Sequence, residues 1–302
     1  MNKYIDHTVH INDISIDPDT RCICSRDTIS TGFTPLMWCS GLSGMNPEYN
    51  QQIDEYLKNN PGEINKQNNK GWTALMIACR NCGIPNRSSV ETVKILLQHN
   101  ADPNLKEHVC GTTALTMSCR YATSLEVIEM LLDNGANIDH QDDGGYTPLI
   151  ESAMLSNPKY SDVDGSLRSS EEVVKLLLDR GADPYIREQL SPCKLSALSH
   201  AMMKIDSTST LGTVKIFLEY DIDIMKCNYI DRVYKHICKN KSELSDQVLQ
   251  MILDNIVEHN ELHKVMGNNS YSMPCDFNRL LVEEYRKKYI MDYVSSKTKR
   301  VN

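Results

Sequence analysis

The 302-residue chain has few aromatic side chains, with only 2 Trp and 3 Phe, and it has no long apolar run. No stretch approaches the ~20 apolar residues that a membrane-spanning helix needs. No basic stretch followed by an apolar run of about 7–15 residues marks a secretory signal. We therefore expect a cytoplasmic protein that does not bind membranes. Its 11 Cys are then expected to be reduced thiols, many of them packed as small buried side chains.

The chain also lacks the short motifs of common enzyme classes. It contains no phosphate-binding G-x-x-x-x-G-K-[ST] loop, no G-x-G-x-x-G, no G-x-S-x-G and no H-E-x-x-H. We expect no enzymatic activity and no cofactor. Three groups of Cys and His residues have spacings that loosely resemble those of metal ligands: Cys79-x-x-Cys82, Cys22-x-Cys24 near His7 and His10, and His259 with His263 and Cys238 or Cys275. Packing in the core or a position on a solvated helix face explains each of them, so we predict no metal site.

A strongly basic character is missing as well. The chain has 32 Lys and Arg against 40 Asp and Glu, and residues 226–302 hold 13 basic against 10 acidic residues, so residues 1–225 contain all of the acidic excess. Because phosphate binding depends on clustered Lys and Arg, we expect no nucleic-acid partner. The basic tail at 286–300 is compatible with a solvated helix end or with a nucleic-acid or nuclear-import patch.

What the sequence does contain is an internal repeat. "GWTALMIAC" (71–79) aligns with "GFTPLMWCS" (32–40), "GTTALTMSC" (111–119), "GYTPLIESA" (145–153) and, more weakly, "KLSALSHAM" (194–202). A second pattern follows each copy, as in "VETVKILLQHNADPN" (90–104) and "EEVVKLLLDRGADPY" (171–185). Self-similarity of this kind indicates a repeat architecture in which each unit packs on its neighbours.

Each unit is expected to form two short helices. Thr34 and Thr147 precede a Pro at the first helical position and are predicted N-caps. The second helix has a one-sided apolar stripe. Gly135 and Gly181, with Asn100 at the equivalent place, are expected to end it in a left-handed conformation, and Gly32, Gly71, Gly111 and Gly145 to form tight turns. Three capping boxes are predicted at its start: Ser88 with Glu91, Thr123 with Glu126, and Ser169 with Glu172.

These motifs resemble the ankyrin repeat, whose pattern is G-x-T-P-L-H-x-A-A followed by V-x-L-L-L-x-x-G-A-D-x-N. The phrasing "NKQNNKGWTALMIACRN" is also similar to ankyrin proteins of giant DNA viruses of the mimivirus type. The turn positions lie 39, 40, 34 and 49 residues apart, and we place the residues in excess of the family period between the two helices of a unit, at 41–50, 81–89 and 156–170. The His of the family pattern is absent, which puts hydrogen bonding between units in question; its place holds Met37, Met76, Thr116, Ile150 and Ser199.

The resemblance implies an all-α ankyrin-repeat solenoid of paired antiparallel helices with β-hairpin or turn tips and degenerate helical caps. We assign residues 1–30 to an N-terminal arm or degenerate cap and 31–225 to repeats at about 31–69, 70–109, 110–143, 144–192 and 193–225. Residues 226–302 are expected to form a C-terminal helical region. Helices expected at 229–240, 245–259 and 276–294 are compatible with a degenerate cap or with a separate recruiting module.

The family implies a non-enzymatic scaffold that binds a partner protein on the concave face of the array. By register, the residue after each turn and the variable position of each first helix lie on this face, and both Trp fall on these two lines. The alternative for the aromatic side chains is that the N-terminal arm or the inserted loops cover them. Two narrower functions remain open, an adaptor that brings substrates to a host ubiquitin ligase through the C-terminal region and a structural virion component. The predicted partner-binding residues are Phe33, Trp38, Trp72, Ile77, Thr112, Met117, Tyr146 and Glu151.

Overall fold

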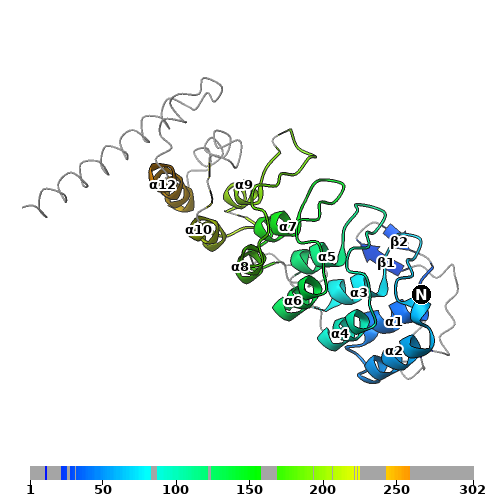
Figure 1. The fold of residues 1–302 in the computed structure, drawn as a ribbon. Coiled ribbons are helices and arrows are strands. Elements are labelled where there is room, and N and C mark those ends of the chain that lie inside the picture. The colour runs from blue at the N-terminus through cyan, green and yellow to red at the C-terminus, as the bar shows by residue number, and fades with distance from the viewer. Residues whose placement is uncertain are drawn as a thin grey trace, which may run out of the picture.

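The chain folds as a stack of helix pairs, preceded by a two-stranded hairpin (Figure 1). The computed structural model describes residues 11, 22–25, 28–30, 32–82, 87–121, 124–157, 169–192, 194–205, 207–220, 222, 224 and 243–258. The first helices of the pairs are α1 (Pro35–Leu42), α3 (Ala74–Asn81), α5 (Ala114–Arg120), α7 (Pro148–Met154) and α9 (Ala197–Met203). The second helices are α2 (Glu48–Asn59), α4 (Val90–Gln98), α6 (Leu125–Asp133), α8 (Glu171–Asp179) and α10 (Leu211–Glu219).

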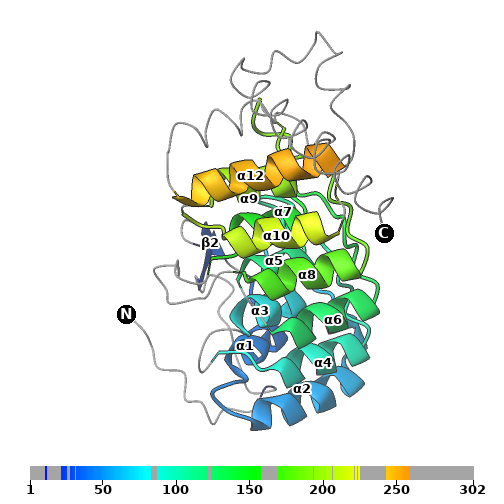
Figure 2. The ribbon, with the colours of Figure 1, turned by 90° about the vertical axis from the view of Figure 1, so that its left-hand side faces the viewer.

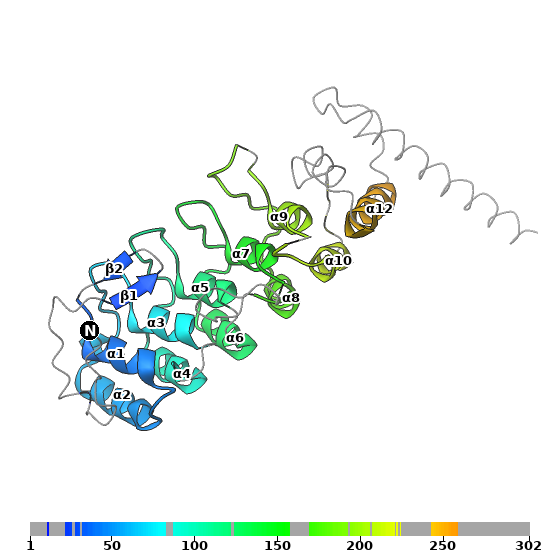
Figure 3. The ribbon, with the colours of Figure 1, turned by 180° about the vertical axis from the view of Figure 1, so that it is seen from behind.

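The helices form two parallel rows, which we call the inner row (α1, α3, α5, α7, α9) and the outer row (α2, α4, α6, α8, α10) (Figures 2 and 3). Within each row every helix packs against the next helix of the same row, and each pair packs internally. Helix α12 (Glu243–Glu258) packs against α10 and so extends the outer row. The predicted all-α repeat solenoid is confirmed.

The inner helices begin as the sequence predicts. The hydroxyl of Thr34 accepts a hydrogen bond from the Met37 N–H at 3.3 Å, and that of Thr147 accepts one from the Ile150 N–H at 3.2 Å. Thr73 and Thr113 cap α3 and α5 in the same way. Each hydroxyl satisfies a backbone donor that has no partner inside the helix, which fixes the point where the helix starts.

The predicted capping residues of the outer helices are wrong by one position. Ser89, not Ser88, caps α4 by accepting from the Thr92 N–H at 3.2 Å, and Ser124 rather than Thr123 caps α6. Ser170 likewise occupies the N-cap position of α8 in place of Ser169. The hydroxyl of Ser88, which does not cap a helix, donates a hydrogen bond to the Ser40 carbonyl near the end of α1, at 2.6 Å. This bond links the first unit to the second.

The turns show which positions need a left-handed backbone. Gly71 has φ +79° and an added Cβ would lie 2.5 Å from the ring of His108, so only glycine fits there. Asn100 (φ 61°) takes the place of the helix-ending glycines, as predicted. Lys194 (φ 47°) takes the place of the turn glycine in the fifth unit. Some of the residues in excess of the family period lie in longer turns at 107–111 and 188–194, not between the two helices of a unit as expected. Of the segment 41–50 that was expected to be inserted, residues 41–42 belong to α1 and residues 48–50 belong to α2.

Successive turns are joined by backbone hydrogen bonds. The N–H groups of His108, Asp143 and Gln189 donate to the carbonyls of Lys70, Cys110 and Gly144, at 2.8, 2.8 and 2.7 Å. At the family His position, the hydroxyls of Thr116 and Ser199 form hydrogen bonds with the hydroxyls of Thr113 and Ser196, which stand at the N-cap positions of α5 and α9, at 3.2 and 3.3 Å. The remaining three side chains at this position are buried and apolar, so they contribute packing in place of a hydrogen bond: Met37, Met76 and Ile150.

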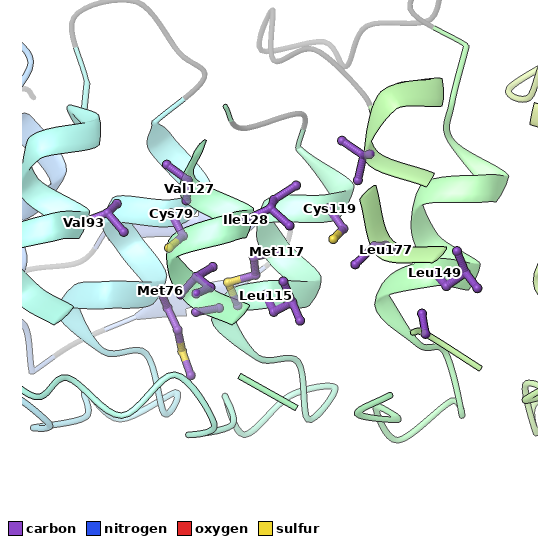
Figure 4. Packing of buried hydrophobic residues seen from close by; sticks show 14 of the residues in the cluster. Met76, Cys79, Val93, Leu115, Met117, Cys119, Val127, Ile128, Leu149 and Leu177 are labelled. Carbon is purple, nitrogen blue, oxygen red and sulfur yellow. The ribbon is translucent and has the colours of Figure 1, made fainter. Parts of the chain in front are cut away.

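One continuous apolar core runs along the array between the two rows. Figure 4 shows Met76 and Cys79 of α3, Leu115 and Cys119 of α5, and Val127 of α6 within it. Burial of such side chains stabilises a solenoid only when neighbouring units are stacked, because each unit alone leaves one face exposed. No described helix combines the length and apolar character needed to cross a bilayer.

The N-terminal arm contributes strands β1 (Cys22–Ser25) and β2 (Thr28–Ser30), which pair antiparallel. The helices predicted at 229–240 and 276–294 lie outside the described residues, as do the loop at 158–168, His7, His10, Cys238, His259, His263 and Cys275.

Candidate protein-binding surface

The first predicted contact pair, Phe33 and Trp38, lies at the start of the inner row. Both side chains are partly exposed, and their ring centroids are 5.8 Å apart with the planes tilted by 53°. The indole Nε1 of Trp38 is buried and bonds to none of the described residues. Two aromatic rings in contact at a partly exposed position provide a rigid apolar contact surface at little conformational cost.

Five of the predicted contact residues are buried instead. Trp72 and Ile77 are 6% exposed, while Thr112, Met117 and Glu151 are 3% exposed. Their neighbours in the stacked units cover positions that the register places on the inner face. These five side chains pack beneath the inner face. A substitution at one of them is expected to lower the stability of the array more than it alters a contact with a partner.

The remaining predicted contact residue is Tyr146. It belongs to a group that we call the distal patch, formed by Tyr146, Leu190 and His200. The rings of Tyr146 and His200 lie 5.8 Å apart, across the boundary between the fourth and fifth units. Leu190 is 72% exposed, and a Cβ built on Gly144 would contact both its side chain and that of Tyr146. The exposed side chain of Leu190 and the partly exposed ring of Tyr146 are therefore neighbours on the surface.

Sequence reasoning missed two arginines at the ends of inner helices. The guanidinium of Arg80 lies over the Tyr121 ring, 5.0 Å from its centroid. Arg120 forms a two-point ion pair with Glu151 of the next inner helix, with Nε 3.0 Å from Oε2. Both arginines stand nine residues after a turn glycine, a periodicity that the repeat alignment contains.

The electrostatics of the distal patch favour a neutral imidazole. Burial lowers the pKa of His200 and outweighs the opposing effect of Glu188 and Glu151, while Lys204 lowers it further. Burial raises the pKa of Tyr146, with the negative charges nearby acting in the same direction. Burial also opposes ionisation of Glu188, but hydrogen bonds from Ser191 and Leu195 outweigh it and lower its pKa.

The Cys79-x-x-Cys82 pair has the character of packing residues. Burial raises the pKa of Cys79 to about 12 and that of Cys82 to about 11, so neither thiol ionises readily near neutral pH. Cys82 is the C-cap of α3 and packs against the core, not in a loop as expected. Among the residues that the structure describes, no three His, Cys, Asp or Glu side chains come together as metal ligands would.

Comparison with known proteins places these repeats in a family. The model of ankyrin repeats matches in three overlapping copies, over residues 11–107, 45–142 and 85–188. The ankyrin repeat protein L91 of Acanthamoeba polyphaga mimivirus is 35% identical over 152 residues, which cover 38% of this chain and 23% of that protein. The ankyrin repeat protein FPV031 of Fowlpox virus is 30% identical over 209 residues, or 67% of this chain and 52% of that protein.

A vertebrate relative shares the same repeats. Ankyrin repeat and SAM domain-containing protein 6 of Rattus norvegicus is 29% identical over 152 residues, covering 48% of this chain and 15% of that protein. The chain thus spans about half of the fowlpox relative and less than a quarter of the mimivirus one. The family model matches more than half of this chain, and the structure has the helix pairs, the capped inner helices and the glycine turns. The chain therefore belongs to the ankyrin-repeat family.

Proposed function

We propose that this chain is a non-enzymatic scaffold that binds a partner protein on its inner face, through Phe33 and Trp38 at one end and the distal patch at the other. Ankyrin repeats are in general protein-interaction modules. The observation that carries the proposal is the distal patch, where a largely exposed Leu190 lies beside Tyr146, whose ring is in tilted contact with that of His200.

The inner face is also preorganised, which supports a binding role. Arg80 and Tyr121 join α3 to the end of α5, and Arg120 and Glu151 join α5 to α7. The tilted contact between the rings of the distal patch joins the fourth unit to the fifth. Side chains that are held in place before binding lose little conformational freedom when a partner docks. The arrangement therefore suits recognition by a stable surface.

We also propose the identity of the partner in broad terms. Because mimivirus and fowlpox proteins are among the relatives, a protein of an infected host is the partner that we favour, with the cytoplasm as the place of encounter. The packing of α12 against α10 supports a capping role for at least this part of residues 226–302. The ligase-adaptor and virion roles stay predictions.

Affinity purification with matched leucine variants tests the proposal. Leu190→Ser removes the exposed apolar side chain of the distal patch, and Leu125→Ser removes an exposed leucine from the outer helix α6. We expect the first variant to recover at least ten-fold less of the principal partner than the parent chain, and the second to recover a normal amount. Equal recovery by both folded variants, with Tyr146→Ala also unchanged, would rule out the distal patch as the binding surface.

A further inference from the structure

The turns that lead into α3, α5, α7 and α9 project from one edge of the array and are of two alternating kinds (Figures 1 and 3). The turns at 67–71 and 141–145 begin with Gln, whereas the turns at 106–111 and 187–194 begin with a basic residue followed by Glu. We call them the Gln turns and the basic turns. In all of them the N–H group of the second residue donates to the carbonyl of the residue after the turn, so their positions are equivalent.

Each Gln turn is bonded to the basic turn that follows it. Nε2 of Gln67 donates to the Lys106 carbonyl at 2.9 Å, and Nε2 of Gln141 donates to the Arg187 carbonyl at 3.1 Å. The same two amide groups also donate to the carbonyl of the glycine that ends their own turn, at 2.6 and 3.0 Å. The edge therefore consists of two copies of one module, each made of a Gln turn and the basic turn after it.

A buried carboxylate holds each basic turn in shape. Glu107 accepts hydrogen bonds from three backbone N–H groups that follow it, at 2.7, 2.7 and 3.2 Å. Glu188 accepts from two backbone N–H groups, at 2.8 and 3.1 Å, and from the Ser191 hydroxyl. Both Glu side chains are buried. Hydrogen bonds from backbone N–H groups to an ionised carboxylate are strong, so each turn has a defined path before any partner binds.

Each basic turn presents an apolar side chain two residues after its buried Glu. Val109 is 46% exposed and Leu190 is 72% exposed. Three residues before each of them stands a basic side chain, Lys106, which is exposed, and Arg187, which is partly exposed. A single exposed apolar side chain is ordinary on a protein surface. Its recurrence at the same place in two turns, each held by a buried carboxylate, indicates a contact point that the array contains twice.

We propose that the two basic turns bind a partner protein that carries two successive copies of an apolar side chain flanked by carboxylates. The apolar side chain of each copy packs on Val109 or Leu190, and a carboxylate pairs with Lys106 or Arg187. Charge complementarity favours an acidic segment, because the Glu of each basic turn is buried and hydrogen-bonded, which leaves the basic side chains as the charge that the turn presents. This inference rests on the proposed function and names the kind of partner.

The order of the modules favours tandem copies in one partner chain. Both modules place the Gln turn before the basic turn, so they follow each other in the same direction along the array. Two segments of a two-fold symmetric dimer run in opposite directions and do not match that arrangement. When one contact has formed, the second segment is held near its site at an effective concentration on the order of millimolar, so two weak contacts give one tight complex.

Labelled synthetic peptides serve as the probe. The single peptide is Asp-Glu-Leu-Glu-Asp, and the tandem peptide contains two copies of it joined by about 20 Gly and Ser residues, whose average span is about 25 Å. The basic turns are two units apart, or about 20 Å, because packed helices lie about 8–10 Å from their neighbours. Fluorescence anisotropy with the full chain measures the affinities. We expect the tandem peptide to bind at least ten-fold more tightly than the single peptide, and a tandem peptide with Lys in place of each acidic residue to bind at least ten-fold more weakly.

Variants of each module test whether both contribute. Val109→Ser and Leu190→Ser each leave one module intact, so each is expected to reduce the affinity for the tandem peptide to that for the single peptide. Leu125→Ser, which changes an exposed leucine of the outer helix α6, is the matched control and is expected to keep the full affinity. Circular dichroism confirms that each variant is folded.

The inference is overturned if the parent chain binds the tandem peptide no more tightly than the single peptide or the Lys-containing one. Full affinity for the tandem peptide in a folded Val109→Ser variant would overturn it as well. Its failure is distinguishable from failure of the proposed function. Loss of partner recovery by Leu190→Ser, together with no advantage of the tandem peptide, would support binding at the distal patch and refute the two-module inference.

Discussion

Arg120 at the end of α5 holds Glu151 of α7 through two hydrogen bonds that cross the boundary between the third and fourth units. Nε donates to Oε2 at 3.0 Å, and Nη2 donates to Oε1. The carboxylate side chain is 3% exposed and the guanidinium side chain 32% exposed. Burial by itself would lower the pKa of the Arg120 guanidinium, but the charge and the hydrogen bonds of Glu151 outweigh this effect and raise its pKa, so Arg120 is charged at neutral pH.

Removing one partner of this pair should destabilise the array. We expect Arg120→Ala to lower the free energy of unfolding by about 3 kcal/mol, because it leaves a buried carboxylate unpaired. Glu151→Ala should cost about 2 kcal/mol, since Arg120 keeps some contact with water. Urea titrations followed by circular dichroism measure both. Lys94→Ala, which breaks the exposed 3.7 Å pair with Glu91, is the control and should cost less than about 0.5 kcal/mol. Equal losses of unfolding free energy in all three variants would show that the buried pair stabilises the array no more than the exposed pair does.

His200 should make stability depend on pH below neutrality. Its pKa is lowered in the folded chain, so the unfolded chain binds the proton more readily. The stability gained from the neutral ring is present above the unfolded pKa of about 6.5 and is lost as the pH falls through the interval between the unfolded and folded values. We expect the parent chain to lose more stability than His200→Asn between about pH 7.5 and 5. Chemical denaturation at the two pH values measures the difference, and parallel losses would contradict the assignment.

Lys194 is the position where a glycine should stabilise the chain. Its φ of 47° lies in the left-handed region that glycine adopts freely, and the aligned residues of the other units are glycines. We expect Lys194→Gly to raise the free energy of unfolding by about 0.5–1 kcal/mol. Lys175→Gly, at an exposed position inside α8, should lower it by about 1 kcal/mol. Thermal unfolding of the two variants shows whether each substitution raises or lowers stability. A loss of stability in both variants would refute backbone strain at Lys194.

The thiols of Cys79 and Cys82 should react slowly. Burial holds their pKa values at about 12 and 11, whereas Cys110 is exposed and is the accessible thiol for comparison. We expect iodoacetamide at about pH 8 to modify Cys110 at least ten-fold faster than either of the other two. Peptide mapping by mass spectrometry gives the three rates. Fast modification of Cys82 in the folded chain would reopen a chemical role for the Cys79-x-x-Cys82 pair.

The helix pairs were predictable because their determinants are local. The Thr34 and Thr147 caps, the turn glycines and the left-handed Asn100 each depend on residues close together in the sequence. The outer-helix caps were predicted one residue early because both candidate positions carry hydroxyls, as in Ser88 and Ser89. The choice depends on the preceding unit, where the Ser40 carbonyl accepts from Ser88.

The inner face was harder to predict because exposure depends on neighbours that are distant in the chain. The register places Trp72 and Tyr146 on the same line, yet the stacked units bury the first and leave the second partly exposed. The Arg120–Glu151 pair joins side chains 31 residues apart, and no short motif marks it. Leu190 was missed because its turn is longer than the turns at 68–71 and 142–145.

Photocrosslinking from matched positions tests the central claim, that the inner face binds a partner protein. A photoreactive phenylalanine analogue is placed at Leu190, on the distal patch, or at Leu125, exposed on the outer helix α6. We expect a discrete crosslinked species from position 190 that an excess of unlabelled chain abolishes, and none from position 125. The same species from position 125 alone, or equally from both positions, would contradict it.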